Sequence, residues 1–359
     1  MPETKVLLIQ NILALYNLPI YNLLGKSPGI SLTVAHYDTS VTREEKFFHE
    51  IVWHFCKAGS LLISKENIKE ICNEYDVVIC LADIHWLSHI MLGLRIKRKF
   101  KLIYWGIGVS ASYKKKFDEE KRWDFIRFFF MKRADALIFY SSYPVQKYVK
   151  HGFRKETLFV ANNTIQVNFK PLVTSEKDLI LFVGTLYKEK GIFELLSAYA
   201  EAYRETSDLP DLFIIGSGEE YINIRNWISQ NKLDEKITLQ GAVYDDVILG
   251  QFFSRAIACI SPNQAGLAVL QSMGSGVPFI TRSDSLTGGE RFNIKNNETG
   301  LIYYQKKELV NILCGINKNK EFFKLMGSNA RKFYESCCRP DQMAKGFLDA
   351  IVFVLNNKK

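Results

Sequence analysis

A loop and a short helix between Ser261 and Thr281 contain the residues best suited to bind a phosphate or a sugar. Pro262 ends the apolar strand before it, because proline cannot donate a hydrogen bond to a strand ladder. Gly266 has no Cβ and lets the backbone approach a ligand, and apolar residues from Leu267 onward recur at helical spacing. A helix N-terminus at the carboxyl end of a parallel strand is a typical site for a phosphate or a sugar hydroxyl.

This stretch resembles the nucleotide-sugar signature of the family 4 glycosyltransferases (glycosyl transferases group 1), which have the GT-B fold. In that family two glutamates, separated by seven residues, lead into a helix of small residues and a Gly-x-Pro turn. Here Asn263 and Gln271 occupy the two positions, so the frame matches while both carboxylates have become amides. The resemblance implies that these amides hydrogen bond sugar or ribose hydroxyls, and that Gln264, Gly266 and Leu267 contact the donor.

The segment Phe182-Val-Gly-Thr-Leu-Tyr-Lys-Glu-Lys-Gly191 resembles the family's Val-Gly-Arg-Leu…Lys-Gly element, whose Arg and Lys hold the donor diphosphate. Lys190 matches the lysine, and Gly184 matches the turn. Thr185 stands where the family has arginine. Lys188 could supply the missing charge, although as a point charge without the planar fork of a guanidinium. The alternative is an ordinary strand–helix turn with a solvated lysine.

Two further turns resemble the family in their order and spacing. The glycines of Ile215-Gly-Ser-Gly218, which are Gly216 and Gly218, match a turn that lies near the nucleotide, although a Gly-x-Gly alone also serves ordinary turns. The segment Leu286-Thr-Gly-Gly-Glu-Arg291 resembles the closing segment of the family. Its Glu290 is a candidate to accept hydrogen bonds from ribose or sugar hydroxyls; the alternative is a surface loop carboxylate.

Candidate residues on the acceptor side follow predicted strands of the first half of the chain. The loop after the first strand, residues 11–21, matches a loop that lines the acceptor side in many relatives. Residues 104–108 resemble a Trp-Gly-His-Gly turn whose histidine touches the donor sugar; isoleucine stands at that position here. The candidates are Asn11, Tyr16, Asn17, Asp83, His85, Trp105, Gly106 and Ile107.

A metal site is not predicted. His85 and His89, four residues apart, could share one face of a helix, as metal-binding histidines do. Asp83 is the sole candidate for a third ligand, and the GT-B resemblance implies catalysis without a metal.

Apolar strand-like runs alternate with helical patterns along the whole chain. Most of the strands are apolar without alternation, which indicates burial on both faces and a parallel sheet. The predicted strands are residues 5–10, 31–37, 76–81, 101–106, 136–141, 157–161, 179–184, 212–216, 237–241, 256–261 and 278–281. The predicted helices are residues 64–74, 85–97, 191–204, 219–231, 267–274 and 342–356. This alternation predicts an α/β protein with two doubly wound, Rossmann-like parallel-sheet domains facing a central cleft.

The domain join is predicted between residues 163 and 177, where Asn, Thr, Lys, Pro and Ser cluster. An N-terminal acceptor-side domain then covers residues 1–165, and a C-terminal nucleotide-sugar-binding domain covers residues 166–341. The resemblance implies that a C-terminal helix within residues 342–359 packs back on the first domain.

The positive charge of the chain is concentrated in its first half. The net charge is +9. Residues 1–165 hold 24 Lys and Arg against 16 Asp and Glu, and the remaining residues hold 23 against 22. A basic half suggests an anionic partner, such as a membrane surface, a phosphate-linked lipid or a nucleic acid; simple solubility is the alternative. We find no RNA-binding motif and expect no nucleic-acid partner.

A basic, aromatic segment at residues 113–133 could lie in a membrane interface, or could form a helix packed on the sheet. No apolar run reaches the roughly 18–20 residues that a membrane span needs. The N-terminus runs directly into a strand without the layout of a signal peptide. We therefore expect a cytoplasmic protein, peripheral on the inner face of the membrane.

The resemblance implies a retaining glycosyltransferase that moves a sugar from a nucleotide-diphosphate donor to a glycan or lipid-linked acceptor, in surface polysaccharide biosynthesis (capsule, lipopolysaccharide or exopolysaccharide). In that mechanism the leaving diphosphate takes the acceptor proton, and Lys190, with Thr185 and the backbone near Gly266, stabilises its charge. The donor is a substrate, and no cofactor is expected. The alternative is a catalytically silent GT-B module that binds a glycan or a partner transferase.

Overall fold

The computed structural model describes residues 3–37, 45–95, 97–111, 117–119, 124–168 and 176–357. The chain divides into two compact units. Unit 1 comprises Met1–Ser110, Asp118–Ile165 and Arg339–Lys359, and unit 2 comprises Ala111–Phe117 and Gln166–Cys338. None of the described helices is both long enough and apolar enough to cross a bilayer.

Unit 1 is built on a sheet in the order β3-β2-β1-β6-β7-β8-β9, in which every neighbouring pair is parallel. Its strands are β1 (Thr4–Ile9), β2 (Ile30–His36), β3 (His49–Val52), β6 (Val77–Leu81), β7 (Lys101–Gly106), β8 (Ala136–Phe139) and β9 (Leu158–Val160). The central strands are apolar and buried on both faces, as a parallel sheet between helical layers requires.

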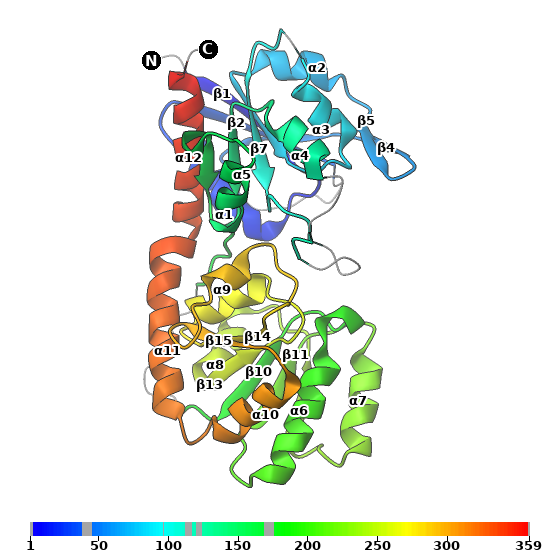
Figure 1. Cartoon of the computed structure of the whole chain (residues 1–359), viewed down its shortest axis with the longest axis vertical. Coiled ribbons are helices and arrows are strands. Elements are labelled where there is room, and N and C mark those ends of the chain that lie inside the picture. The colour runs from blue at the N-terminus through cyan, green and yellow to red at the C-terminus, as the bar shows by residue number, and fades with distance from the viewer. Residues whose placement is uncertain are drawn as a thin grey trace. The chain divides into compact units, whose positions relative to one another are not determined.

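The helices of unit 1 are α1 (Leu18–Gly25), α2 (Ile68–Ile71), α3 (Leu87–Leu92), α4 (Asp124–Met131), α5 (Tyr143–Lys150) and α12 (Pro340–Asn356). A two-stranded antiparallel sheet of β4 (Phe55–Ala58) and β5 (Leu61–Ser64) adds to them. Helix α12 lies against α1 and the strands of unit 1 (Figure 1), and it buries Met343, Phe347 and Ile351 in the core. The ring of Phe347 lies 5.0 Å from that of Trp105 in an edge-to-face contact.

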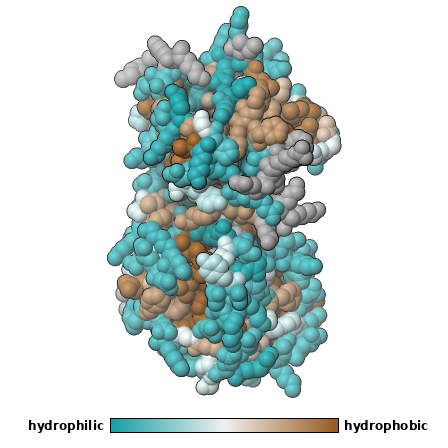
Figure 2. Space-filling view, in the orientation of Figure 1, coloured by the Kyte–Doolittle hydropathy of each residue, from teal (hydrophilic) through white to brown (hydrophobic). Residues whose placement is uncertain are grey.

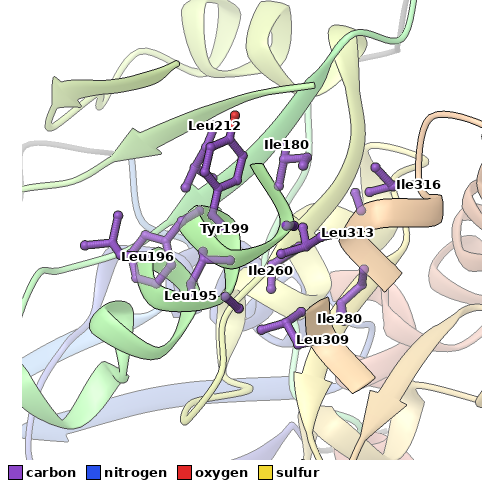
Figure 3. Close-up of a cluster of buried hydrophobic side chains, with 14 of the residues drawn as sticks. Ile180, Leu195, Leu196, Tyr199, Leu212, Ile260, Ile280, Leu309, Leu313 and Ile316 are labelled. Carbon is purple, nitrogen blue, oxygen red and sulfur yellow. The ribbon is translucent and has the colours of Figure 1, made fainter. Parts of the chain in front are cut away.

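Unit 2 repeats the design with a parallel sheet in the order β12-β11-β10-β13-β14-β15. Its strands are β10 (Leu179–Val183), β11 (Asp211–Ile215), β12 (Ile237–Gly241), β13 (Ala256–Ile260), β14 (Phe279–Arg282) and β15 (Gly300–Tyr303). Its helices are α6 (Ile192–Glu205), α7 (Tyr221–Gln230), α8 (Asp246–Arg255), α9 (Leu267–Gly274), α10 (Lys306–Gly315) and α11 (Lys320–Phe333). Figure 3 shows its core, where side chains of α6 such as Leu195 and Tyr199 meet Ile180 and Leu313.

In each sheet the strand order reverses at one position, the topological switch point. The first strand of each unit, β1 or β10, lies between the next strand in sequence and the fourth strand of its sheet, β6 or β13. In doubly wound sheets, ligands bind outside the carboxyl ends of the strands at this switch point. The loops that follow β1 and β6 in unit 1, and β10 and β13 in unit 2, are therefore the places to look for a site.

Two predicted helices of unit 1 are shorter than expected. Helix α2 covers Ile68–Ile71 and continues as a 3-10 turn, instead of residues 64–74, and α3 covers Leu87–Leu92 instead of residues 85–97. The reason is a tertiary contact that the local pattern does not encode. Leu62 of β5 forms a bridge with Trp86 and its N–H donates to the His85 carbonyl, so both segments begin in extended backbone.

Candidate functional site

Lys190 ends a 3-10 turn, η4 (Lys188–Lys190), in the loop after β10. Its side chain reaches back over Gly184, since a Cβ placed on that glycine would lie 3.1 Å from Lys190 Nζ. Burial lowers the pKa of Lys190 to about 8. The ammonium group forms no ion pair with another described residue. The loop therefore holds a partly desolvated cation whose counter-charge the described residues do not supply.

Two glycines bring a second loop, the one after β11, against the Lys190 loop. A Cβ on Gly216 would lie 1.9 Å from the Gly184 carbonyl oxygen, and a Cβ on Gly218 would lie 2.3 Å from that of Leu186. Backbone hydrogen bonds join the two loops: Gly184 N–H donates to the Ile215 carbonyl at 3.0 Å, and Leu186 N–H donates to Ser217 at 2.9 Å. Only residues without a Cβ permit this approach.

The loop after β13 lies against the same turn. Asn263 N–H donates to the Lys190 carbonyl at 3.2 Å, and its own carbonyl accepts from Leu286 N–H at 2.8 Å. The Asn263 side chain fills the space beside Gly191, where a Cβ would come within 2.5 Å of it and where φ is +72°. Gln264 Oε1 accepts a 3.0 Å hydrogen bond from the hydroxyl of Tyr187, which connects the two loops through side chains.

Asn263 also carries an unsatisfied acceptor. Its Oδ1 is buried and has no hydrogen-bond partner among the described residues. A buried amide oxygen without a donor costs about 1–3 kcal/mol, so such an atom is a place where a ligand hydroxyl would be stabilising. This atom and the Lys190 ammonium belong to loops that hydrogen bond each other.

Glu290 is buried, which excludes the alternative of a surface carboxylate. It begins the 3-10 turn η5 (Glu290–Asn293), and its Oε2 accepts from Thr287 Oγ1 at 3.0 Å and from Gly288 N–H at 2.8 Å. The carboxylate therefore orders the loop that carries it. A role toward ribose or a sugar stays a prediction.

Helix α9 begins at Leu267 with Gly266 as its N-cap, and no side chain caps its first N–H groups. Open N–H groups at a helix start favour an anion. Gln271 lies on α9 one turn beyond Leu267, and it is half-buried. Thr185 and Lys188 are exposed in the Lys190 loop. Unit 2 thus gathers all of its predicted residues on four neighbouring segments.

In unit 1, the loops at the switch point carry five of the eight predicted residues of the acceptor side, and the other three lie at the end of β7. Asn11 follows β1, is exposed, and its Oδ1 accepts from Ile12 N–H at 3.0 Å. Tyr16 is also exposed, whereas Asn17 is buried. The pattern did not single out Ile12 and Leu15, which are 51% and 60% exposed beside Tyr16 and give the loop an apolar surface.

Asp83 and His85 lie together in the loop after β6. His85 Nδ1 is 2.8 Å from Asp83 Oδ1, and both side chains are exposed. His89 lies apart from them in the core, where burial lowers its pKa to about 3 and its Nε2 is 3.2 Å from the Tyr37 hydroxyl. Within the described ranges, no three His, Cys, Asp or Glu side chains form a group that could hold a metal ion.

The prediction that Trp105 lies on the acceptor side is wrong for its side chain. It is 1% exposed and packs edge-to-face against Tyr140 at 5.4 Å and against Phe347, so its side chain belongs to the core of unit 1. Gly106 is buried as well, and Ile107 is half-buried. The apolar run of β7 explains this outcome, because every side chain of a central parallel strand faces a helical layer.

Comparison with known proteins shows which protein family unit 2 matches and which fold the chain has. Residues 164–333 match the family model described as glycosyl transferases group 1. The fold matches that of Anabaena HepE in complex with UDP over 98% of this chain and 100% of that one, with a TM-score of 0.71 and 12% identity. The lipopolysaccharide outer core galactosyltransferase WaaB, in its apo form, matches over 98% and 99% with a TM-score of 0.70 and 16% identity.

Unit 2 therefore belongs to the glycosyl transferases group 1 family, and the chain has the GT-B fold. The predicted family and fold class are confirmed.

Curated relatives match over shorter stretches. The poly(glycerol-phosphate) alpha-glucosyltransferase of Bacillus subtilis is 24% identical over 234 residues, which is 63% of this chain and 33% of that protein. The alpha-monoglucosyldiacylglycerol synthase of Acholeplasma laidlawii is 23% identical over 161 residues, or 44% of this chain and 39% of that one. The chain thus spans about a third of the length of these relatives.

Proposed function

We propose that this chain transfers a sugar from a nucleoside-diphosphate donor to a hydroxyl of a glycan or lipid-linked acceptor, with retention at the anomeric carbon. The donor is a substrate, and the reaction uses neither a metal nor a further cofactor. The cellular setting is the synthesis of a surface polysaccharide.

The observation that carries this proposal is the partly buried ammonium of Lys190 without an ion-pair partner among the described residues. A desolvated cation is unfavourable unless an anion compensates it. The open N–H groups at the start of α9 add positive potential in the same unit. A diphosphate has the charge and the size to satisfy both, so the site is suited to a nucleotide.

The chemistry follows from the charge that develops on the leaving group. As the bond from the anomeric carbon to the diphosphate breaks, the diphosphate gains negative charge, which Lys190 and the start of α9 stabilise. The diphosphate oxygen then takes the proton of the acceptor hydroxyl on the same face of the sugar. The uncharged amides of Asn263 and Gln271 orient the sugar or the ribose without a carboxylate nucleophile.

The relatives support the choice of substrates. HepE is known with UDP and with UDP-glucose, and TarM with UDP and alpha-GlcNAc-glycerol. The names of WaaB and of the two curated relatives describe transfer to lipopolysaccharide, to poly(glycerol phosphate) and to a diacylglycerol lipid. Ile12 and Leu15 give unit 1 an exposed apolar surface at its switch point, which suits an acceptor with a lipid part.

A peripheral position on the cytoplasmic face of an anionic membrane is part of the proposal. Helix α4 packs on the sheet through Phe128 and Met131, and it leaves Phe125 and Phe129 62% and 47% exposed. The Arg133 guanidinium lies 4.2 Å from the centroid of the Phe129 ring. Apolar residues gather over the region of α3, α4 and the β4–β5 hairpin in Figure 2. Residues 113–116 and 120–123 of the predicted basic segment lie outside the described residues.

Exposed aromatic side chains beside basic ones fit a membrane interface. Co-sedimentation with phosphatidylglycerol vesicles tests this part of the proposal. Phe125→Ser and Phe129→Ser together are expected to reduce binding, whereas Ile222→Ser, on an exposed position of α7, should leave it unchanged. Equal binding of both variants would contradict it.

A thermal-shift screen with UDP, GDP and their sugar conjugates tests the transferase. A ligand at about 100 times its dissociation constant stabilises the protein by roughly 2.7 kcal/mol. We expect one nucleotide to raise the melting temperature of the wild type, and Lys190→Ala to abolish the shift. The alternative function, a catalytically silent binding module, predicts no shift with any nucleotide.

A further inference from the structure

A groove of about 440 Å³ runs along β15, the edge strand of the unit 2 sheet. Helices α10 and α11 both contact this strand (Figure 1). The groove is lined by Asn296, Asn297, Leu301, Ile302, Tyr303, Glu308, Asn311, Ile312, Gly315, Asn319, Phe322 and Phe323. None of these residues belongs to the loops around Lys190, so the groove is a separate feature of the surface.

The lining combines amides with apolar surface. Four of its side chains are asparagines, and no hydrogen bond joins the side chains of Asn297 or Asn311 to another described residue. The apolar part includes the half-buried Ile312 and the residue Phe322, which is 42% exposed. A carboxylate is present at Glu308, and its Oε2 accepts from Tyr304 N–H at 3.0 Å.

An extended peptide would have to pair with the backbone of β15, which is already engaged. Ile302 N–H donates to Asn296 Oδ1 at 2.9 Å, and Tyr304 N–H donates to Glu308. The Gly300 carbonyl accepts from Asn297 N–H at 2.9 Å. These contacts occupy backbone groups of β15 that an added strand would need for pairing. An occupant must therefore bind through the side chains of the groove rather than through its backbone.

We propose that this groove binds a segment of a neutral oligosaccharide. A pyranose ring has an apolar face, which matches Phe322 and Ile312, and a rim of hydroxyls that both donate and accept. Free asparagine amides also donate and accept, so Asn297 and Asn311 fit these hydroxyls without a charge to compensate. The choice of a glycan rests in part on the proposed function, because a transferase that extends a polymer meets its own product. The groove would hold the growing chain near the enzyme between transfers.

Saturation-transfer NMR with maltotetraose, chitotetraose and a β-1,4-galactan tetrasaccharide, each at millimolar concentration, tests this site. We expect signal transfer to at least one of them. Phe322→Ala removes the stacking surface and should weaken that binding roughly threefold to tenfold. Asn297→Gly removes one amide while tolerating the positive φ of +64° at that position. Leu325→Ala, an exposed position of α11 outside the lining, is the matched control and should bind as the wild type does.

The result that overturns the proposal is transfer to none of the three probes, or binding that neither Phe322→Ala nor Asn297→Gly alters. Adding UDP and Lys190→Ala separates this inference from the transferase. Oligosaccharide binding by a wild-type protein that binds no nucleotide would leave the groove standing and reject the proposed function. Lys190→Ala, which lies outside the groove, should bind the oligosaccharide as the wild type does. Nucleotide binding without oligosaccharide binding would support the proposed function and reject the groove as an oligosaccharide site.

Discussion

The two units share one strand order around their switch points and differ in how the loops there are built. In unit 2 the loops are packed backbone to backbone, with Gly216 against Gly184 and the Asn263 side chain against Gly191. In unit 1 the loop after β1 exposes Ile12 and Leu15 to solvent.

This difference indicates that unit 2 suits a small charged ligand and that unit 1 suits an acceptor with apolar parts. Tight loops around a partly buried cation would fix a small, charged ligand in one orientation, as the proposed nucleotide diphosphate requires. An open apolar loop tolerates acceptors of varied shape. Under the proposed function, the same topology would serve two kinds of recognition, because the sheet fixes where the loops meet and the loop residues determine which ligand they bind.

The largest effect is expected from a methyl group added to the loops of unit 2, compared with one added in unit 1. Gly216→Ala should destabilise the protein by on the order of 3 kcal/mol and abolish nucleotide binding, because the Cβ would meet the Gly184 carbonyl. Gly106→Ala in unit 1 should cost at most about 1 kcal/mol, since its nearest neighbour would be Ala82 Cβ at 3.6 Å. Chemical denaturation measures both. Equal destabilisation of the two variants would contradict the comparison.

Lys190→Met should lower the affinity for the nucleotide and raise the stability of the folded protein. Burial has lowered the pKa of this lysine to about 8 in the folded state, so below pH 8 its charge opposes folding. At pH 7 the variant should be more stable than the wild type by at most about 3 kcal/mol. Its affinity for the nucleotide should fall at least about 100-fold. Asn11→Ala in unit 1 is the control, with unchanged nucleotide affinity in titration calorimetry.

The pH dependence of nucleotide binding sharpens the role of the same lysine. The free enzyme loses the charge on Lys190 as the pH rises through about 8. The dissociation constant should therefore increase by about tenfold from pH 7 to pH 9. Lys190→Arg keeps its charge over this range, so its profile should be flat. If the dissociation constant of Lys190→Arg rises with pH as that of the wild type does, the pH effect belongs to another group.

The smallest effect on stability is expected in the open loop of unit 1. Leu15→Ser should change the free energy of unfolding by no more than about 0.5 kcal/mol, because the side chain is exposed. It should raise KM for the acceptor several-fold and leave the nucleotide-induced thermal shift unchanged. Steady-state kinetics with varied acceptor measures the first effect. An unchanged acceptor KM would remove this loop from the acceptor side.

The fold was predictable because a buried parallel strand leaves a continuous apolar run, as in Val6–Ile9. The loops of unit 2 were predictable because glycines such as Gly216 mark close backbone approaches. The late starts of helices α2 and α3 were not predictable. Both segments begin in extended backbone because a bridge joins Leu62 to Trp86, and this contact links residues that are distant in the sequence. The burial of Glu290 likewise depends on the neighbours that the fold supplies, which the residue type does not indicate. The burial of Trp105, in contrast, follows from the apolar run of the strand that contains it.

The origin of unit 1 from separate parts of the chain has a consequence for its synthesis. The core of unit 1 includes Phe347 and Ile351 of α12, which the ribosome makes after the whole of unit 2. Domains generally fold as units while the chain emerges. The sheet of unit 1 is therefore made before unit 2 but stays without α12 until unit 2 has been made, so unit 1 completes its core after unit 2.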